Sequence, residues 1–168
     1  MGGDRHPQVR NLRDLKPIEL TQGTRFGFVR KRLSTEVGSR ELGASWFEVP
    51  PGRQNFPRHY HFGNEEAFYV LSGSGTIRLG DASVPIEAGD FIACPAGAES
   101  AHAIVNTGTE PLRYLGISTA HSTDVVVYAD SKKFSAVGGA DMQKGLKAAP
   151  FFRTVKDQPD VDYYLDEE

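Results

Sequence analysis

The stretch HYHFGNEEAFYV, residues 59–70, begins with two histidines separated by one residue. In an extended strand, residues two apart point to the same face, so His59 and His61 look into the same space. Residues 62–65 read as a turn, and in the strand that follows Glu66, Phe68 and Val70 share one face. Two of these three side chains are apolar, which predicts an interior face where the Glu66 carboxylate needs a partner.

A third histidine is placed to join this group. His102 begins the apolar run Ala103–Val105, and a return strand would bring it to the same point. A lone His-x-His pair is more often a surface feature, but three imidazoles and one carboxylate would form a mixed nitrogen and oxygen site. Such a set suits zinc, manganese, iron, nickel, cobalt or copper and matches calcium or magnesium poorly.

Glycine and proline punctuate the whole chain. Eighteen Gly and ten Pro make up one sixth of the 168 residues, which favours short strands over long helices. Between residues 25 and 128 we count about ten strand-sized pieces and expect no helix. This pattern predicts an all-β sandwich or barrel. The predicted strands include Phe26–Val29, Ala44–Val49, Ala67–Leu71, Thr76–Leu79, Ala82–Ile86, Phe91–Cys94, Ala103–Val105, Leu112–Ile117 and Asp124–Tyr128.

The two ends of the chain differ from its middle. We divide it into an N-terminal arm (1–24), a β-barrel domain (25–128) and a C-terminal extension (129–168). The arm holds a short amphipathic stretch, residues 9–15, in which we expect a helical turn. Residues 130–133 and 137–140 read as loops, and residues 150–155 as one more strand or as an apolar strap laid over the barrel.

Two spaced sets of residues carry a family resemblance. The first is Gly52, His59, His61, Glu66 and Gly73; the second is Gly89, Pro95, Gly97, His102 and Asn106. In these residues, which cover roughly 40–120, the chain resembles the cupin superfamily of small double-stranded β-helix barrels. The first spacer is one residue longer than the usual motif, and the gap between Gly97 and His102 is two residues longer.

The resemblance implies a jelly-roll-like double-stranded β-helix barrel with terminal arms. It also implies that His59, His61, Glu66 and His102 are ligands of one divalent transition metal. A metal-dependent enzyme acting on a small organic substrate is then expected, with isomerase, lyase or dioxygenase chemistry. The alternative is a non-catalytic module that binds or senses a small molecule. Some relatives are labelled sugar-phosphate isomerases, but no feature of the sequence independently indicates a phosphate site.

Several other residues have a plain interpretation beside a chemical one. His121 lies in a polar loop and is our candidate acid or base at the barrel mouth, although a solvated loop histidine is the commoner case. Cys94, the single cysteine, is expected to be a small buried hydrophobe. Asn106 is expected to satisfy backbone groups, and Glu65 to be exposed.

Composition excludes several classes of protein. The formal net charge is −3, so nothing in the overall charge favours nucleic acid or an anionic membrane as a partner. One cysteine allows no internal disulfide and no cysteine-based zinc site. With no signal-like segment, we expect a cytoplasmic protein. Residues 1–40 carry a net +5 and residues 155–168 a net −5. We expect a homodimer in which the N-terminal arm covers a sheet edge.

Overall fold

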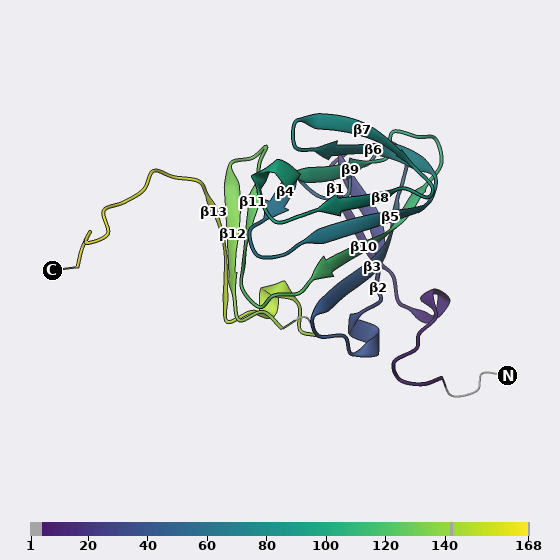
Figure 1. Ribbon diagram of the computed structural model, residues 1–168, viewed down its shortest axis with the longest axis horizontal. Helices are drawn as coiled ribbons and strands as arrows, with labels where there is room; N and C mark the ends of the chain where they lie inside the picture. The colour runs from purple at the N-terminus through teal and green to yellow at the C-terminus, as the bar shows by residue number, and fades with distance from the viewer. Residues whose placement is uncertain (1–4, 142, 168) are drawn as a thin grey trace.

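A computed structural model describes residues 5–141 and 143–167 of the chain (Figure 1). Residues 1–4 and 168, at the ends of the predicted arm and extension, and residue 142 lie outside this description. The strands are β1 (Ile18–Gln22), β2 (Phe26–Arg32), β3 (Leu42–Val49), β4 (His59–His61), β5 (Glu66–Ser72), β6 (Ser74–Leu79), β7 (Ala82–Glu87), β8 (Phe91–Cys94), β9 (His102–Val105), β10 (Leu112–Thr119), β11 (Asp124–Tyr128), β12 (Lys133–Gly138) and β13 (Phe151–Lys156).

Four short 3-10 helices connect some of these strands: η1 (Leu12–Asp14), η2 (Thr35–Val37), η3 (Ala98–Ser100) and η4 (Leu146–Ala148). The helical turn expected in the N-terminal arm is confirmed by η1. Within the described ranges, no helix has the length or the apolar character to cross a membrane.

The strands form two antiparallel sheets that face each other. One sheet has six strands in the order β1-β2-β3-β10-β5-β8, and the other has seven in the order β13-β12-β11-β4-β9-β6-β7. The predicted all-β barrel of the jelly-roll type is confirmed, and every strand expected between residues 25 and 128 is present. Glycines with positive φ make the tight connections, for example Gly73 between β5 and β6, where a Cβ would lie 2.6 Å from the Pro111 carbonyl oxygen.

The core lies between the inner faces of the two sheets. Phe28, Phe47 and Phe68 come from the six-stranded sheet, and Ile77 and Ile104 from the seven-stranded one. On β3 and β5 the buried residues alternate with more exposed ones, as is typical of an antiparallel sheet with one face on the core. The predicted interior face of Phe68 and Val70 is therefore confirmed, and Glu66 stands at its end.

The C-terminal extension holds two further strands. The prediction of loops at residues 130–133 and 137–140 was wrong for Lys133, Val137 and Gly138, which belong to β12. This strand pairs with β11, and β13 pairs with β12, so residues 151–156 are a strand rather than a strap. The pattern was missed because Ser135, a small polar residue, alternates with Val137 on the buried face. Strand β1 likewise joins residues of the predicted arm to the six-stranded sheet.

Asn106 stabilises the far end of the barrel. Its Nδ2 donates to the carbonyl oxygens of Val49 (2.7 Å) and Glu110 (2.8 Å), and its Oδ1 accepts from the Gly108 N–H (3.0 Å). The side chain is fully buried, so the expected role of satisfying backbone groups is confirmed.

Replacing this amide should unfold the protein more easily. We expect Asn106→Ala to lower the free energy of unfolding by about 2–4 kcal/mol, because one buried and two partly buried backbone groups lose their partner. Thr107→Ala is the matched control, since its hydroxyl makes one exposed hydrogen bond to Thr76 and its loss should cost less than about 0.5 kcal/mol. Urea denaturation measures both; equal midpoints for the two variants would contradict this role.

Candidate metal centre

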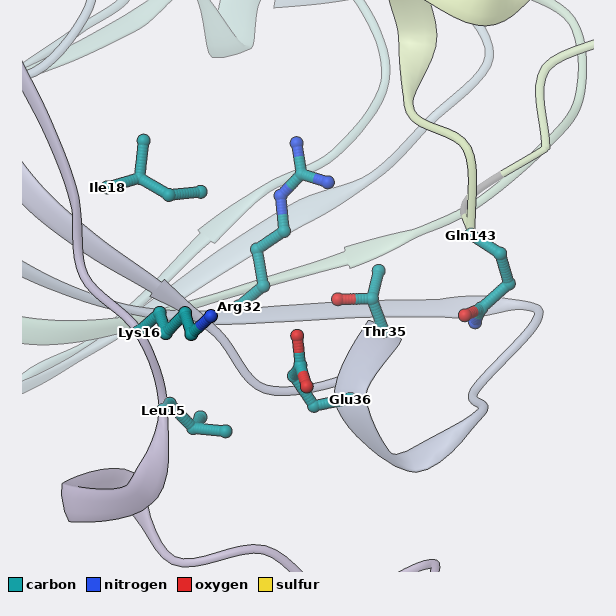
Figure 2. Close-up of a pocket in the computed structure, with 7 residues that line it drawn as sticks. All are labelled: Leu15, Lys16, Ile18, Arg32, Thr35, Glu36 and Gln143. Carbon is teal, nitrogen blue, oxygen red and sulfur yellow. The ribbon is translucent and has the colours of Figure 1, made fainter.

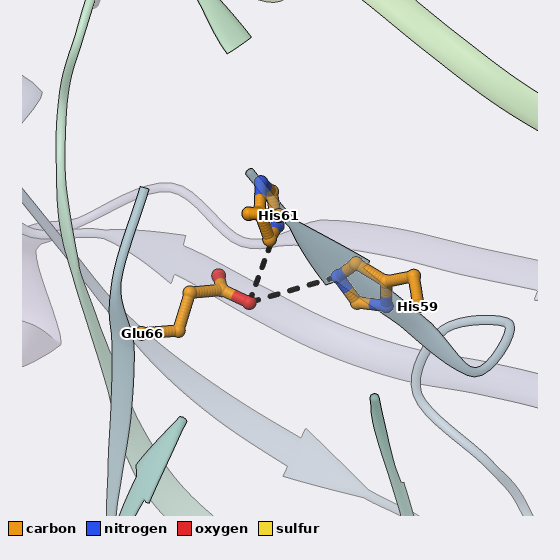
Figure 3. Close-up of side chains that lie close together, drawn as sticks. All are labelled: His59, His61 and Glu66. Carbon is orange, nitrogen blue, oxygen red and sulfur yellow. Dashed lines mark ion pairs between the residues drawn. The ribbon is translucent and has the colours of Figure 1, made fainter. Parts of the chain in front are cut away.

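Three strands bring the predicted ligands to one place. His59 and His61 are the ends of the short strand β4, Glu66 is the first residue of β5, and His102 is the first residue of β9. Strand β4 lies between β11 and β9, and His59 stands directly opposite His102. The predicted return strand is thus present, and Figure 3 shows His59 and His61 facing the Glu66 carboxylate from their shared strand.

One carboxylate oxygen is the centre of the group. The Nε2 atoms of His59, His61 and His102 lie 3.6, 3.4 and 3.0 Å from Glu66 Oε2. The ligand atoms of His59, His61 and Glu66 all lie within 4.8 Å of one another, a grouping that could hold a metal ion. The fourth residue, His102, reaches the group through its contact with Glu66.

These close atoms do not satisfy one another. His61 Nε2, His102 Nε2 and Glu66 Oε2 are buried and, among the described residues, have no hydrogen-bond partner, even though the distances are short. The directions are unsuitable for hydrogen bonds. Buried polar atoms are almost always paired, so three unpaired ones side by side need an explanation. A cation that accepts all their lone pairs is the one that fits.

The opposite nitrogen of each imidazole is held in place. Nδ1 of His59 lies 2.9 Å from the Pro57 carbonyl oxygen, and Nδ1 of His102 lies 2.9 Å from that of Ser100. A carbonyl can only accept, so both Nδ1 atoms carry the proton and donate it. In the neutral imidazole Nε2 then keeps its lone pair, and this is the form that binds a metal.

His61 has a carboxylate partner that the sequence analysis missed. Its Nδ1 donates to Asp124 Oδ2 over 2.5 Å, and the same carboxylate accepts from the Gly63 N–H and from Asn64 Nδ2, each at 2.8 Å. Burial would raise the pKa of Asp124, but the hydrogen bonds from His61 and Asn64 lower it to about 2. A signal was available, because Asp124 opens the apolar strand Asp-Val-Val-Val and is itself buried.

The charges in the centre are strongly coupled. Burial would raise the pKa of Glu66, but the three neighbouring imidazoles, His102 first, hold it well below its usual range. Burial would lower the pKa of His61, but Asp124 and Glu66 raise it to about 9. For His102, contacts with Cys94 and Glu66 outweigh burial and raise the pKa to about 10. The pocket therefore favours positive charge beside Glu66, whether from protons or from a cation.

His121 lies beside this group rather than in it. The side chain is exposed, and its backbone N–H donates to Asn64 Oδ1 (2.8 Å), which also accepts from the Thr119 hydroxyl. The loop thereby supports the Asn64–Asp124–His61 chain of hydrogen bonds. A role for its imidazole as acid or base stays a prediction. Cys94 is buried and Glu65 is exposed, as expected.

The four candidate ligands lie in a stretch of the chain that matches a known family. Residues 45–118 match the family model described as the cupin domain. The chain carries a cupin domain. The matched range holds all four candidate ligands and ends within β10, so the terminal arms lie outside it.

Relatives of this cupin domain have been described under several activities. A candidate sugar phosphate isomerase from Acidithiobacillus ferrooxidans superposes with a TM-score of 0.78 at 28% identity, over 93% of this chain and 97% of that one. A predicted oxalate decarboxylase from Thermotoga maritima superposes with a TM-score of 0.57 at 25% identity, over 67% of this chain and 99% of that one.

A curated relative adds a sequence match. The oxalate-binding protein of Thermotoga maritima is 36% identical over 70 residues, which are 42% of this chain. The match spans about half the length of that protein, 55%. These neighbours share the cupin fold and differ in the activity given to them, so the fold alone does not determine the activity.

The contact between His61 and Asp124 should matter for metal affinity. We expect Asp124→Asn to weaken metal binding by about 10- to 100-fold, because a neutral amide replaces the charged acceptor of the His61 Nδ1 proton and its single oxygen cannot accept from both His61 and Gly63. Asp130→Asn is the matched control; Asp130 pairs on the surface with Arg58 and Arg78. Competition with a chromophoric chelator measures both affinities. Equal affinity in the two variants would remove Asp124 from the site.

Metal binding should also compete with protons. His61 and His102, with pKa values of about 9 and 10, are mostly protonated at neutral pH, and a metal takes the neutral form. We expect affinity to rise between pH 6 and 9 and about one to two protons to be released per metal at pH 7.5. Calorimetry in two buffers of different ionisation enthalpy counts these protons. A pH-independent affinity over this range would contradict the protonated state.

Proposed function

We propose that this cupin is a metal-dependent enzyme that acts on a small organic substrate. The observation that carries the proposal is the group of buried, unpaired ligand atoms on His61, His102 and Glu66. The imidazoles of His61 and His102 are each held in place by a hydrogen bond at Nδ1. His59 completes the four-residue set. Zinc, manganese, iron and nickel all suit three imidazoles and one carboxylate.

The residues of the chain would divide the work at this centre. The imidazoles and Glu66 would hold one divalent transition metal, which supplies Lewis-acid or oxygen chemistry when bound. Asp124 would keep His61 in the ligating form. Phe68, buried next to Glu66 on the inner face of β5 and 5.3 Å from the His102 ring, would exclude water from one side of the substrate.

Isomerase or lyase chemistry is our leading reaction class. The candidate sugar phosphate isomerase covers nearly the whole chain, and the predicted oxalate decarboxylase shares the barrel. Both reactions stabilise negative charge on oxygens next to a carbon that loses a proton or a carboxyl group, which is where a bound cation helps most. Dioxygenase chemistry stays within the proposal if the metal is iron.

A second candidate is a binding module without turnover. The curated relative is an oxalate-binding protein, which favours this alternative. The site also offers few groups for proton transfer. Tyr114 faces the interior, but burial raises the pKa of its hydroxyl, which accepts a hydrogen bond from Asn55 Nδ2 (3.0 Å). His121 is the remaining candidate, and its side chain is exposed.

Metal content tests the proposal first. We expect protein purified without chelator to contain about one equivalent of transition metal, and the His59→Ala/His102→Ala variant to contain almost none, because it keeps only two of four ligands. His6→Ala is the matched control, an exposed histidine of the arm. Elemental analysis gives the result. No bound metal in the wild type, after reconstitution with zinc, manganese, iron and nickel in turn, would sink the proposal.

Turnover then separates the two candidates. Metal-loaded wild type would be tested for isomerisation of aldose phosphates and for decarboxylation of oxalate, beside the double variant. Turnover lost in the variant supports the enzyme, whereas saturable binding of oxalate with no product supports the binding module. The predicted homodimer and cytoplasmic location remain proposals beside this function.

A further inference from the structure

Two arginines lie on the inner face of the six-stranded sheet and do not belong to the four candidate metal ligands. Arg30 and Arg32 are spaced two apart from Phe28 on β2, and Phe28 belongs to the core, so all three side chains point inward. Their partners on β3 agree: Arg30 stands opposite Phe47 and Arg32 opposite Ser45, both of which are buried. A sheet interior is an unusual place for two cations.

Arg30 shares its surroundings with the metal centre. Its Nε donates to Ser45 Oγ (2.9 Å), and its guanidinium lies 5.4 Å from the centre of the Phe47 ring. Burial lowers the pKa of Arg30 and the charge of Arg32 lowers it further, while Glu66 and Tyr114 act in the opposite direction. The charges of Arg32 and Glu66 therefore both influence the pKa of Arg30.

Arg32 is a half-buried cation for which the described residues offer no ion-pair partner. Its Nε is inaccessible and has no hydrogen-bond partner, and no carboxylate among the described residues forms an ion pair with it or with Arg30. Arg32 lines a pocket of about 460 Å³, in which Figure 2 shows its guanidinium between Ile18 and Gln143. Lys16 adds a second cation to this pocket, and Glu36 lines it without pairing to Arg32.

Small residues separate the arginines from Glu66. Across the six-stranded sheet, Arg32 is followed by Ser45, Gly116 and Phe68 in one row of directly paired residues. The next row toward the metal centre is Gly43, Ser118 and Glu66. Directly paired residues project from the same face, so serines and glycines line the inner surface between the two polar groups. A small molecule lying there could contact both.

We propose that Arg30 and Arg32 form an anion subsite that binds a carboxylate or phosphate group of the ligand. Guanidinium groups match both anions in geometry and charge. In this proposal the arginines of β2 hold the anionic end of the ligand, and the other end reaches the metal centre. The second contact rests on the proposed function. The ligand would then be a small acid or a phosphorylated compound.

Anion titration of the purified protein tests the subsite. Calorimetry with inorganic phosphate and with oxalate at pH 7.5 and low salt would be run on wild type, Arg32→Gln, Arg30→Gln/Arg32→Gln and Lys31→Gln. We expect Arg32→Gln to weaken the better-bound anion by about tenfold or more, because a charge-assisted contact is lost. Lys31→Gln is the matched control, with the same charge change on the outer face of the same strand, where Lys31 donates to the Leu12 carbonyl oxygen. It should alter affinity less than about twofold.

The two anions distinguish the ligand classes. Preference for phosphate indicates a phosphorylated ligand, and preference for oxalate indicates a carboxylate. Wild-type affinity in the double arginine variant would overturn the subsite, as would a wild type that binds neither anion at millimolar concentration. Metal content, measured on the same samples, separates the two proposals: anion binding that depends on the arginines in a protein without metal would support the subsite and reject the metal-dependent function.

Thermal stability separates a ligand contact from a structural role. A half-buried cation that forms no ion pair with the described residues adds little to the stability of the fold, so Arg32→Gln should melt at the same temperature as wild type or higher. Phosphate or oxalate, whichever is bound, should raise the melting temperature of wild type and of Lys31→Gln but not of the double arginine variant. A clear loss of stability in Arg32→Gln, with anion affinity unchanged, would assign Arg32 to the fold and overturn the proposal.

Discussion

The site depends on hydrogen bonds that fix each imidazole from behind. Backbone carbonyls hold Nδ1 of His59 and His102, and a buried carboxylate holds Nδ1 of His61. These contacts fix the orientation of each ring, so that the three Nε2 atoms face Glu66. The core beneath them is apolar and closely packed, with the rings of Phe47 and Tyr114 stacked 5.1 Å apart. The stability of this apolar core therefore allows the polar atoms of the metal centre to remain without hydrogen-bond partners.

The inner face of the six-stranded sheet changes character along its strands. On β5 the inward residues run from Val70 through Phe68 to Glu66, and on β2 they run from Phe28 to Arg30 and Arg32. Both strands thus pass from apolar core to charge toward the same end of the barrel. Glu66 faces the three imidazoles, whereas no carboxylate of the described residues forms an ion pair with either arginine. The apolar end of this inner face forms part of the core, and the charged end holds the residues of the proposed site.

The sequence predicted most of the fold and the four candidate ligands, because both leave local traces. Gly and Pro punctuate short runs, and His59, His61 and Glu66 are close in sequence with side chains set by the two-residue period of a strand. Asp124 was missed because its partner His61 is 63 residues away, a pairing that no local pattern records. The inward orientation of Arg30 and Arg32 was missed for another reason, because alternating arginines in the sequence of a strand are typical of a solvated face.

The same separation along the chain has a kinetic meaning. His59 contacts His102, His61 contacts Asp124, and β10 joins β3 to β5, so the contacts that complete the centre join segments remote in sequence. Closing such large loops comes late in folding, when the sheets have already paired. Isolated fragments of the nascent chain hold at most the His-x-His pair and the neighbouring Glu66. An ion therefore finds its full set of four ligands only in a finished barrel, because His102 joins the other three through the pairing of β4 with β9.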